Sequence, residues 1–258
     1  MRLMKRILSA AAVLALSASL LVGCSSGTAS SVPVSASSAA ESTVSSVEET
    51  ASSAVDENEA AAAQLLNDLT GSYQELWPVI LAAEYKQTWL DDCTALVGED
   101  NAEAAFEKLS SMVTGDVYGE DAVKAYANGG GAYFCGFTNS LAILTFDGET
   151  STISGTDKDG NVLFSHTYHY IGMEPVRGLY EFQSDDADSG EFTYFFLAPD
   201  TSAETYHIEF RYGSDAEALS QYDTGEYAYW LASGISTDCD QTMIDNCIEL
   251  FCTENLAG

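Results

Sequence analysis

The chain has little positive charge and little histidine, and both shortages narrow its possible functions. Its 258 residues hold 9 lysines and arginines against 40 aspartates and glutamates, a formal net charge of −31. A surface of that sign repels nucleic acid and anionic lipid and attracts cations. With only 3 histidines and no G-x-S-x-G nucleophile turn, the usual nucleophile–histidine arrangements have few ways to form. We therefore expect a protein that is not an enzyme.

A C-x-x-C pair is also lacking, although the chain has 6 cysteines. Such pairs are typical of zinc fingers and of thiol oxidoreductases, so neither class is indicated. Apart from Cys24, which belongs to the N-terminal segment, the cysteines are Cys93, Cys135, Cys239, Cys247 and Cys252. The sequence leaves both free thiols and disulfides open for these five positions.

Basic residues within the first six positions precede a single long apolar run, residues 7–22. This order is typical of a secretory signal peptide, and an uncleaved membrane anchor is the alternative. The run ends at Leu21-Val22-Gly23-Cys24, which resembles a bacterial lipobox. We expect residues 1–23 to be removed and Cys24 to be lipidated, so that the chain is anchored to the membrane outside the cytoplasm.

Residues 24–57 differ in composition from everything that follows. They are mostly Ser, Ala, Thr, Val and Glu, and they contain no aromatic residue. Such a segment cannot bury enough apolar surface to offset its conformational entropy, so we predict a disordered linker. Residues 58–258 carry all the tryptophans and tyrosines and are expected to form one domain.

The pattern of apolar residues divides this domain into three blocks. Helical periodicity predicts helices over residues 59–127, and helical residues return from 214 onward. Between them lie predicted strands, separated by turn signals such as Asp147-Gly148 and Asp159-Gly160. The strands are 132–137, 141–146, 150–154, 162–170, 178–183, 192–197 and 206–212. A run of strands without intervening helices predicts an antiparallel barrel or half-open sandwich, so the fold class is mainly β with helical flanks (α+β).

His207 and Glu209 stand two positions apart on the last of these strands. Alternate strand residues point to the same face, so one segment can offer an imidazole and a carboxylate to a single zinc ion. The alternative is an ordinary exposed pair on a sheet. His166 and His169 are three positions apart on another predicted strand, so at most one of them points inward.

Several local strings between about Leu69 and Ser236 belong to a known pattern. They are Gly71-Ser72-Tyr73 with Trp77-Pro78, Val176-Arg177-Gly178-Leu179-Tyr180-Glu181-Phe182, Ala198-Pro199, His207-Ile208-Glu209 and Glu226-Tyr227-Ala228-Tyr229-Trp230. In these strings the chain resembles the ZinT family of extracytoplasmic zinc-binding domains, which also occur in AdcA-type zinc-capture lipoproteins.

The resemblance implies a lipocalin-like β-barrel that binds a divalent cation, zinc first, and delivers it to an uptake system such as a metal ABC transporter. Where the family has three histidines, this chain has His207, Glu209 and Phe195. Phe195 cannot bind a metal, so His169 is the candidate third ligand. The family's histidine-rich loop is missing as well.

The alternative hypothesis is a degenerate barrel that has lost the metal. Its aromatic side chains, for instance Tyr194, Phe196 and Tyr206, would then hold a small organic ligand or mediate contact with a protein partner.

Overall fold

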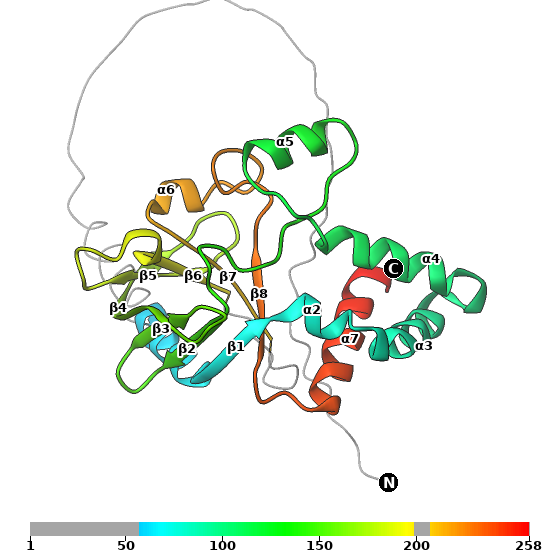
Figure 1. Cartoon of the computed structure of the whole chain (residues 1–258), viewed down its shortest axis with the longest axis horizontal. Helices are drawn as coiled ribbons and strands as arrows, with labels where there is room; N and C mark the ends of the chain where they lie inside the picture. Colours follow the sequence, from blue (N-terminus) through cyan, green and yellow to red (C-terminus); the bar gives the residue numbers. More distant parts are fainter. Residues whose placement is uncertain (1–56, 199–206, 258) are drawn as a thin grey trace, which may run out of the picture. The chain divides into compact units, whose positions relative to one another are not determined.

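Eight antiparallel strands close into a barrel, and helices pack beside it (Figure 1). The structure is a computed structural model, and it describes residues 57–198 and 207–257. The predicted signal peptide, lipidation site and linker therefore lie outside the described residues, as does Tyr206. The strands are β1 (Gly71–Glu75), β2 (Ile143–Asp147), β3 (Thr152–Thr156), β4 (Val162–Met173), β5 (Tyr180–Ser184), β6 (Tyr194–Leu197), β7 (His207–Gly213) and β8 (Ala232–Ser236).

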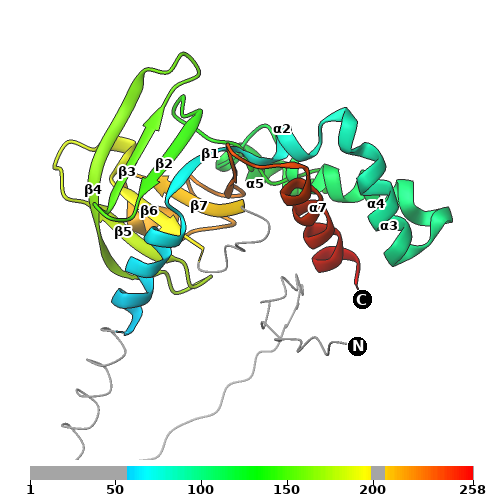
Figure 2. The same cartoon turned by 90° about the horizontal axis from the view of Figure 1, so that it is seen from below.

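The helical elements come mainly from the two ends of the domain. Residues 57–68 are helical, and two short 3-10 turns, η1 (Ala83–Tyr85) and η2 (Gly190–Phe192), occur farther along. The other helices are α2 (Leu76–Ile80), α3 (Lys86–Val97), α4 (Glu99–Val113), α5 (Glu120–Ala127), α6 (Ala216–Leu219) and α7 (Gln241–Leu256). Figures 1 and 2 both show α3, α4 and α7 gathered beside the barrel.

The barrel confirms the predicted fold class, with a correction at its seam. Each strand pairs with the next along the chain, and β1 pairs with β8 to close the ring. Both of these strands were missed by the sequence pattern, which placed β1 inside a helical block and β8 inside another. The predicted strand 132–137 is wrong in turn, because only Phe134 of that segment makes isolated bridges, to Thr114 and Trp230.

Aromatic rings fill the interior of the barrel. Phe195 of β6 packs against rings from β4 and β7, with centroid distances of 5.3 Å to Tyr212 and 5.4 Å to Tyr168. Gly155 of β3 makes room for this packing, because a Cβ there would lie 2.4 Å from the ring of Phe164. Burial of rings of this size contributes roughly 2–3 kcal/mol each to folding.

A second hydrophobic core lies between the helices and the outside of the barrel wall. Trp89 of α3 is fully buried there, and its indole N–H donates to the Ile80 carbonyl at 2.7 Å. Ile235 of β8 joins this core. Ala232, three positions before it on the same strand, faces the aromatic interior. The wall formed by β7 and β8 therefore separates the two cores, and residues on its outer face lie toward the helices.

Candidate functional site

His207 and Glu209 lie on the outer face of β7. Their neighbours Ile208 and Phe210 belong to the aromatic core inside the barrel, so the alternate residues point outward. His207 is paired across the ladder with Ile235 of the helical core. The two candidate ligands thus share one half-buried face, as the spacing predicts, and this face looks toward the helices instead of into the barrel.

Glu209 shares its surroundings with two cysteine thiols. It pairs with Ser233 of β8, and Cys135 and Cys247 are near enough to feel its charge. Burial raises the pKa of Cys135 and the pKa of Cys247 to about 12, and the Glu209 carboxylate adds to both shifts. Both thiols are therefore protonated at neutral pH and are poor nucleophiles.

His169 does not join this pair. It lies on β4, and β5 and β6 stand between β4 and β7 in the barrel wall. Its side chain is exposed, and its Nδ1 atom lies 2.6 Å from the Oδ1 atom of Asp185. His166 points to the opposite face of β4, stacks on Phe164 and has its Nδ1 atom 2.7 Å from the Oδ2 atom of Asp186. The acidic loop after β5 thus provides partners for these two histidines.

Phe195 occupies the barrel interior, on the other side of the wall from His207 and Glu209. Tyr194 and Phe196 alternate with it and lie on the opposite face of β6; Tyr194 is half-buried and Phe196 is buried. The position where the ZinT resemblance puts a third histidine is therefore part of the hydrophobic core.

Within the described part of the chain, no group of three or more His, Cys, Asp or Glu side chains is arranged to hold a metal ion. A structural zinc site needs four ligands and a catalytic one needs three. The residues described here thus supply the pair His207 and Glu209, and a further donor has to move toward them for zinc to be held.

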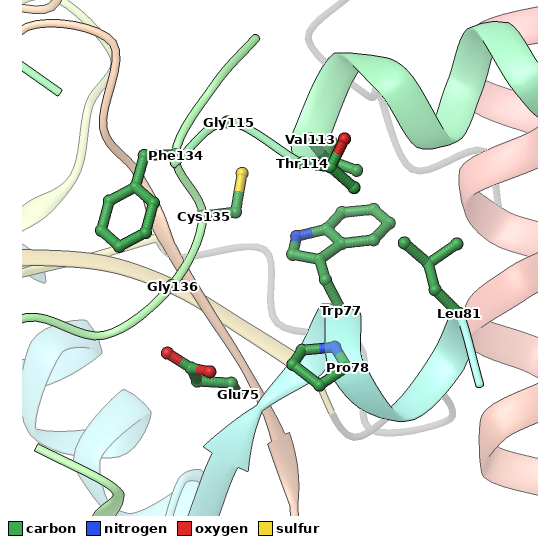
Figure 3. Close-up of a pocket in the computed structure, with 10 residues that line it drawn as sticks. All are labelled: Glu75, Trp77, Pro78, Leu81, Val113, Thr114, Gly115, Phe134, Cys135 and Gly136. Atoms are coloured by element: carbon green, nitrogen blue, oxygen red, sulfur yellow. The ribbon is translucent and has the colours of Figure 1, made fainter. Parts of the chain in front are cut away.

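A cavity of about 340 Å³ opens beside this face, between the barrel and the helices (Figure 3). Its walls are mostly apolar, with a carboxylate, a hydroxyl and a thiol among them. It is lined by Glu75, Trp77, Pro78, Leu81, Val113, Thr114, Gly115, Phe134, Cys135 and Gly136. The lining comes from three separate stretches of the chain, residues 75–81, 113–115 and 134–136, so no sequence pattern could have indicated it.

The polar groups of this cavity differ in how well they are satisfied. Glu75 accepts a hydrogen bond from the Phe137 amide at 2.6 Å. The Trp77 indole nitrogen is buried, and Figure 3 shows it directed toward Cys135, whose thiol it contacts as a weak acceptor. Sulfur is a weak hydrogen-bond acceptor, so an oxygen acceptor that entered the cavity would be a stronger partner for this N–H.

An adjacent cavity of about 390 Å³ lies on the far side of Thr114 and Gly115, which line both. Its wall is formed by the end of α4, by α5 and by residues 130–132.

No helix among residues 57–198 and 207–257 is long and apolar enough to cross a membrane.

The fold defines the class of protein: a closed, eight-stranded antiparallel barrel with attached helices. No protein-family model matches the chain, and no curated protein matches it. Among solved structures it is similar to the Zn(II)-bound ZinT-like domain of Streptococcus pneumoniae AdcA, with 16% identity over 71% of this chain and 89% of that one, at a TM-score of 0.45.

It is also similar to Zn(II)-bound AdcA from Streptococcus pneumoniae, with 14% identity and a TM-score of 0.42. That match covers 72% of this chain but 35% of AdcA, so the chain spans about a third of that protein.

Proposed function

We propose that the chain is a membrane-tethered binding protein that captures a divalent cation, zinc first, and delivers it to an uptake system. The observation that supports this is the placement of His207 and Glu209 on one face of β7, beside the thiols of Cys135 and Cys247. Imidazole, carboxylate and thiolate are the groups that zinc prefers in proteins, and a Cys135 or Cys247 thiol would release its proton on binding the ion. We expect the further donor to come from the side of β7 that carries the Cys135 and Cys247 thiols, because His169 lies across the barrel wall.

The rest of the chain suits this role. A lipid on Cys24 and a linker over residues 24–57 would hold the domain near the membrane, where a metal ABC transporter is the natural recipient. The excess of acidic residues raises the local concentration of cations around the domain. Zinc is here a cargo that the protein binds and releases, and no reaction is required.

Calorimetric titration of the metal-free protein with zinc, in about 0.15 M salt to screen the diffuse surface charge, tests the proposal. We expect one binding site whose affinity falls at least about tenfold in His207→Ala and in Glu209→Ala, as for the loss of a metal ligand. His169→Ala is the matched control and should bind as the unsubstituted protein does. Weak, salt-sensitive binding at several sites, with an affinity that neither ligand substitution changes, would refute the proposal.

A second candidate function rests on the cavity of about 340 Å³ and its Trp77 N–H, which has only the weakly accepting Cys135 thiol as a partner. These features suit a small apolar molecule that carries one neutral hydrogen-bond acceptor. A negatively charged acceptor would be repelled by Glu75 in the same wall. Acetophenone is a suitable probe for this ligand class if the zinc titration gives only diffuse binding.

A further inference from the structure

Two cysteines from opposite ends of the domain meet inside the helical core. Cys93 lies on α3 and Cys252 on α7, 159 positions apart in the sequence. Their Sγ atoms are 3.9 Å apart, and both residues are fully buried. All five cysteines of the described residues are free thiols in this structure.

Aromatic contacts hold these two helices in place around the thiols. Phe251, next to Cys252, packs edge-on against Trp89 at 6.0 Å and against Trp77 at 4.7 Å. Trp89 lies one helical turn before Cys93 on α3. The thiols therefore face one another because bulky neighbours fix both helices, and small rotations of the side chains are the only motion left to them.

The other cysteines have different surroundings. Cys135 and Cys247 lie near Glu209, and Cys239 is half-buried just before α7. On α7 itself, Cys247 and Cys252 are five positions apart and so do not lie one above the other. Cys247 and Cys252 therefore lie on different sides of α7, and Cys252 is the one that faces Cys93.

We propose that Cys93 and Cys252 form a disulfide bond when the chain folds in an oxidising compartment. The sulfur atoms have to approach from 3.9 Å to the bonded distance of about 2.05 Å, a shift of roughly 1 Å for each. The helices need not separate for this. The inference is independent of which ligand the protein binds.

The reaction requires a disulfide as two-electron oxidant. One cysteine thiolate attacks a sulfur of the oxidant, a mixed disulfide forms, and the first thiolate of the oxidant leaves. The second cysteine thiolate then attacks the protein sulfur of the mixed disulfide and releases the other thiolate. The two protein thiols lose two protons and two electrons, and the oxidant becomes two thiols.

Burial determines when the bond can form. Burial raises the pKa of the Cys93 thiol and that of the Cys252 thiol, with nearby Asp92 adding to both shifts. Few thiolates exist in the packed core, and an oxidant cannot reach them. The bond therefore forms during folding, and the finished bond is shielded from reductants by the same packing.

The test is peptide mapping of the full chain after refolding from urea with a mixture of oxidised and reduced glutathione. Remaining thiols are alkylated in denaturant, and the digest is analysed without reduction. We expect one linked peptide that joins Cys93 to Cys252, and alkylated Cys135, Cys239 and Cys247. The chain refolded in reductant, without oxidant, should have a Tm lower by roughly 5–12 °C, since the bond closes a long loop.

The substitution Cys93→Ser should abolish both the linked peptide and the effect of reductant on the Tm, whereas Cys239→Ser should preserve both. Alkylation of Cys93 and Cys252 after refolding, or a link from either to another cysteine, would overturn the proposal. Mapping of the unsubstituted chain decides the question even when Cys93→Ser does not fold.

Discussion

The barrel and the helical part solve the same problem of burying aromatic side chains in different ways. Inside the barrel the polar tips of the rings are satisfied: the Tyr212 hydroxyl accepts from the Thr138 amide at 2.6 Å and donates to the Thr138 carbonyl at 2.9 Å. Outside the barrel interior, among the described residues, buried polar atoms that lack a well-formed hydrogen bond occur both in the helical part, at Trp77 and Asp92, and on the outer side of the barrel wall, at Arg211 and Tyr222. Unsatisfied polar groups of this kind leave room for a ligand or a change of state.

The two parts also differ in how they use the chain. Barrel strands pair with their neighbours in sequence, except at the seam between β1 and β8. The helical core instead brings α3 and α4 from the beginning of the domain against α7 at its end. The cavity of about 340 Å³ lies where the two parts meet, because residues from three distant stretches of the chain come together there.

The largest expected effect tests the barrel as a packed core. Phe195→Ala removes a fully buried ring that touches four others, so we expect a loss of about 3–5 kcal/mol in the free energy of unfolding. Urea denaturation measures it. Val162→Ala on β4 is the control, because its side chain is 70% exposed, and it should change the value by less than about 0.5 kcal/mol.

A Phe195→His variant also tests whether residue 195 lies in the hydrophobic core of the barrel. If the interior is a hydrophobic core, an imidazole there destabilises the barrel and leaves zinc affinity unchanged, because His207 and Glu209 lie on the other face of the wall. A rise in zinc affinity would show that the three positions converge, and would contradict the placement described above.

A smaller effect is expected at Arg211, which is fully buried on the outer side of β7. Its guanidinium donates to the carbonyls of Leu219, Gln221 and Tyr227, and it stacks on Tyr222 with its Cζ atom 4.4 Å from the ring centre. Lysine keeps the charge but cannot reach three carbonyls from one plane. Arg211→Lys should cost about 2–3 kcal/mol in urea denaturation.

Arg177→Lys is the matched control for this prediction. Arg177 lies over the same Tyr222 ring, 4.2 Å from its centre, but it is only half-buried and makes one hydrogen bond to a side chain, the Tyr133 hydroxyl. The loss should be below about 1 kcal/mol. Equal losses for the two arginines would show that stacking on Tyr222, and not the carbonyl network, holds this region together.

The sequence predicted the barrel because its middle strands carry their own signals. β2 to β7 have apolar alternation and Asp-Gly turns, so their order follows from the chain. β8, Ala-Ser-Gly-Ile-Ser, has small residues and low strand propensity, and it forms because β1 and β7 pair with it on both sides. β1 is a strand for the same reason, between helical segments.

The candidate site was predictable only in part. Spacing alone placed His207 and Glu209 on one face, and the spacing of His166 and His169 placed them on opposite faces. Spacing could not reveal which face of β7 lies outside the barrel, since both faces meet apolar groups. Ile208 and Phe210 lie on the inner face, and Ile235 of β8 lies beside the outer face. The meeting of Glu209 with Cys135 and Cys247 depends on the packing of helices distant in sequence.

The smallest expected effect tests the helical part through pH. Burial raises the pKa of Asp92, and the neighbouring carboxylates Glu249, Asp245 and Asp91 raise it further. The folded state therefore binds this proton more tightly than the unfolded state, and the stability linked to it is complete below the unfolded pKa and is lost as pH rises through the folded pKa. Asp92→Asn should accordingly stabilise the protein at pH 7, by up to about 1 kcal/mol.

The gain should shrink as pH falls and vanish near pH 3, where Asp92 is protonated in both states. Urea denaturation at pH 3, 5 and 7 measures it, with Asp188→Asn as the control on an exposed loop of the barrel. A gain that is the same at all three pH values would mean that the amide makes a new hydrogen bond. Repulsion between Asp92 on α3 and the carboxylates of α7 would then not be what limits the stability of the helical part.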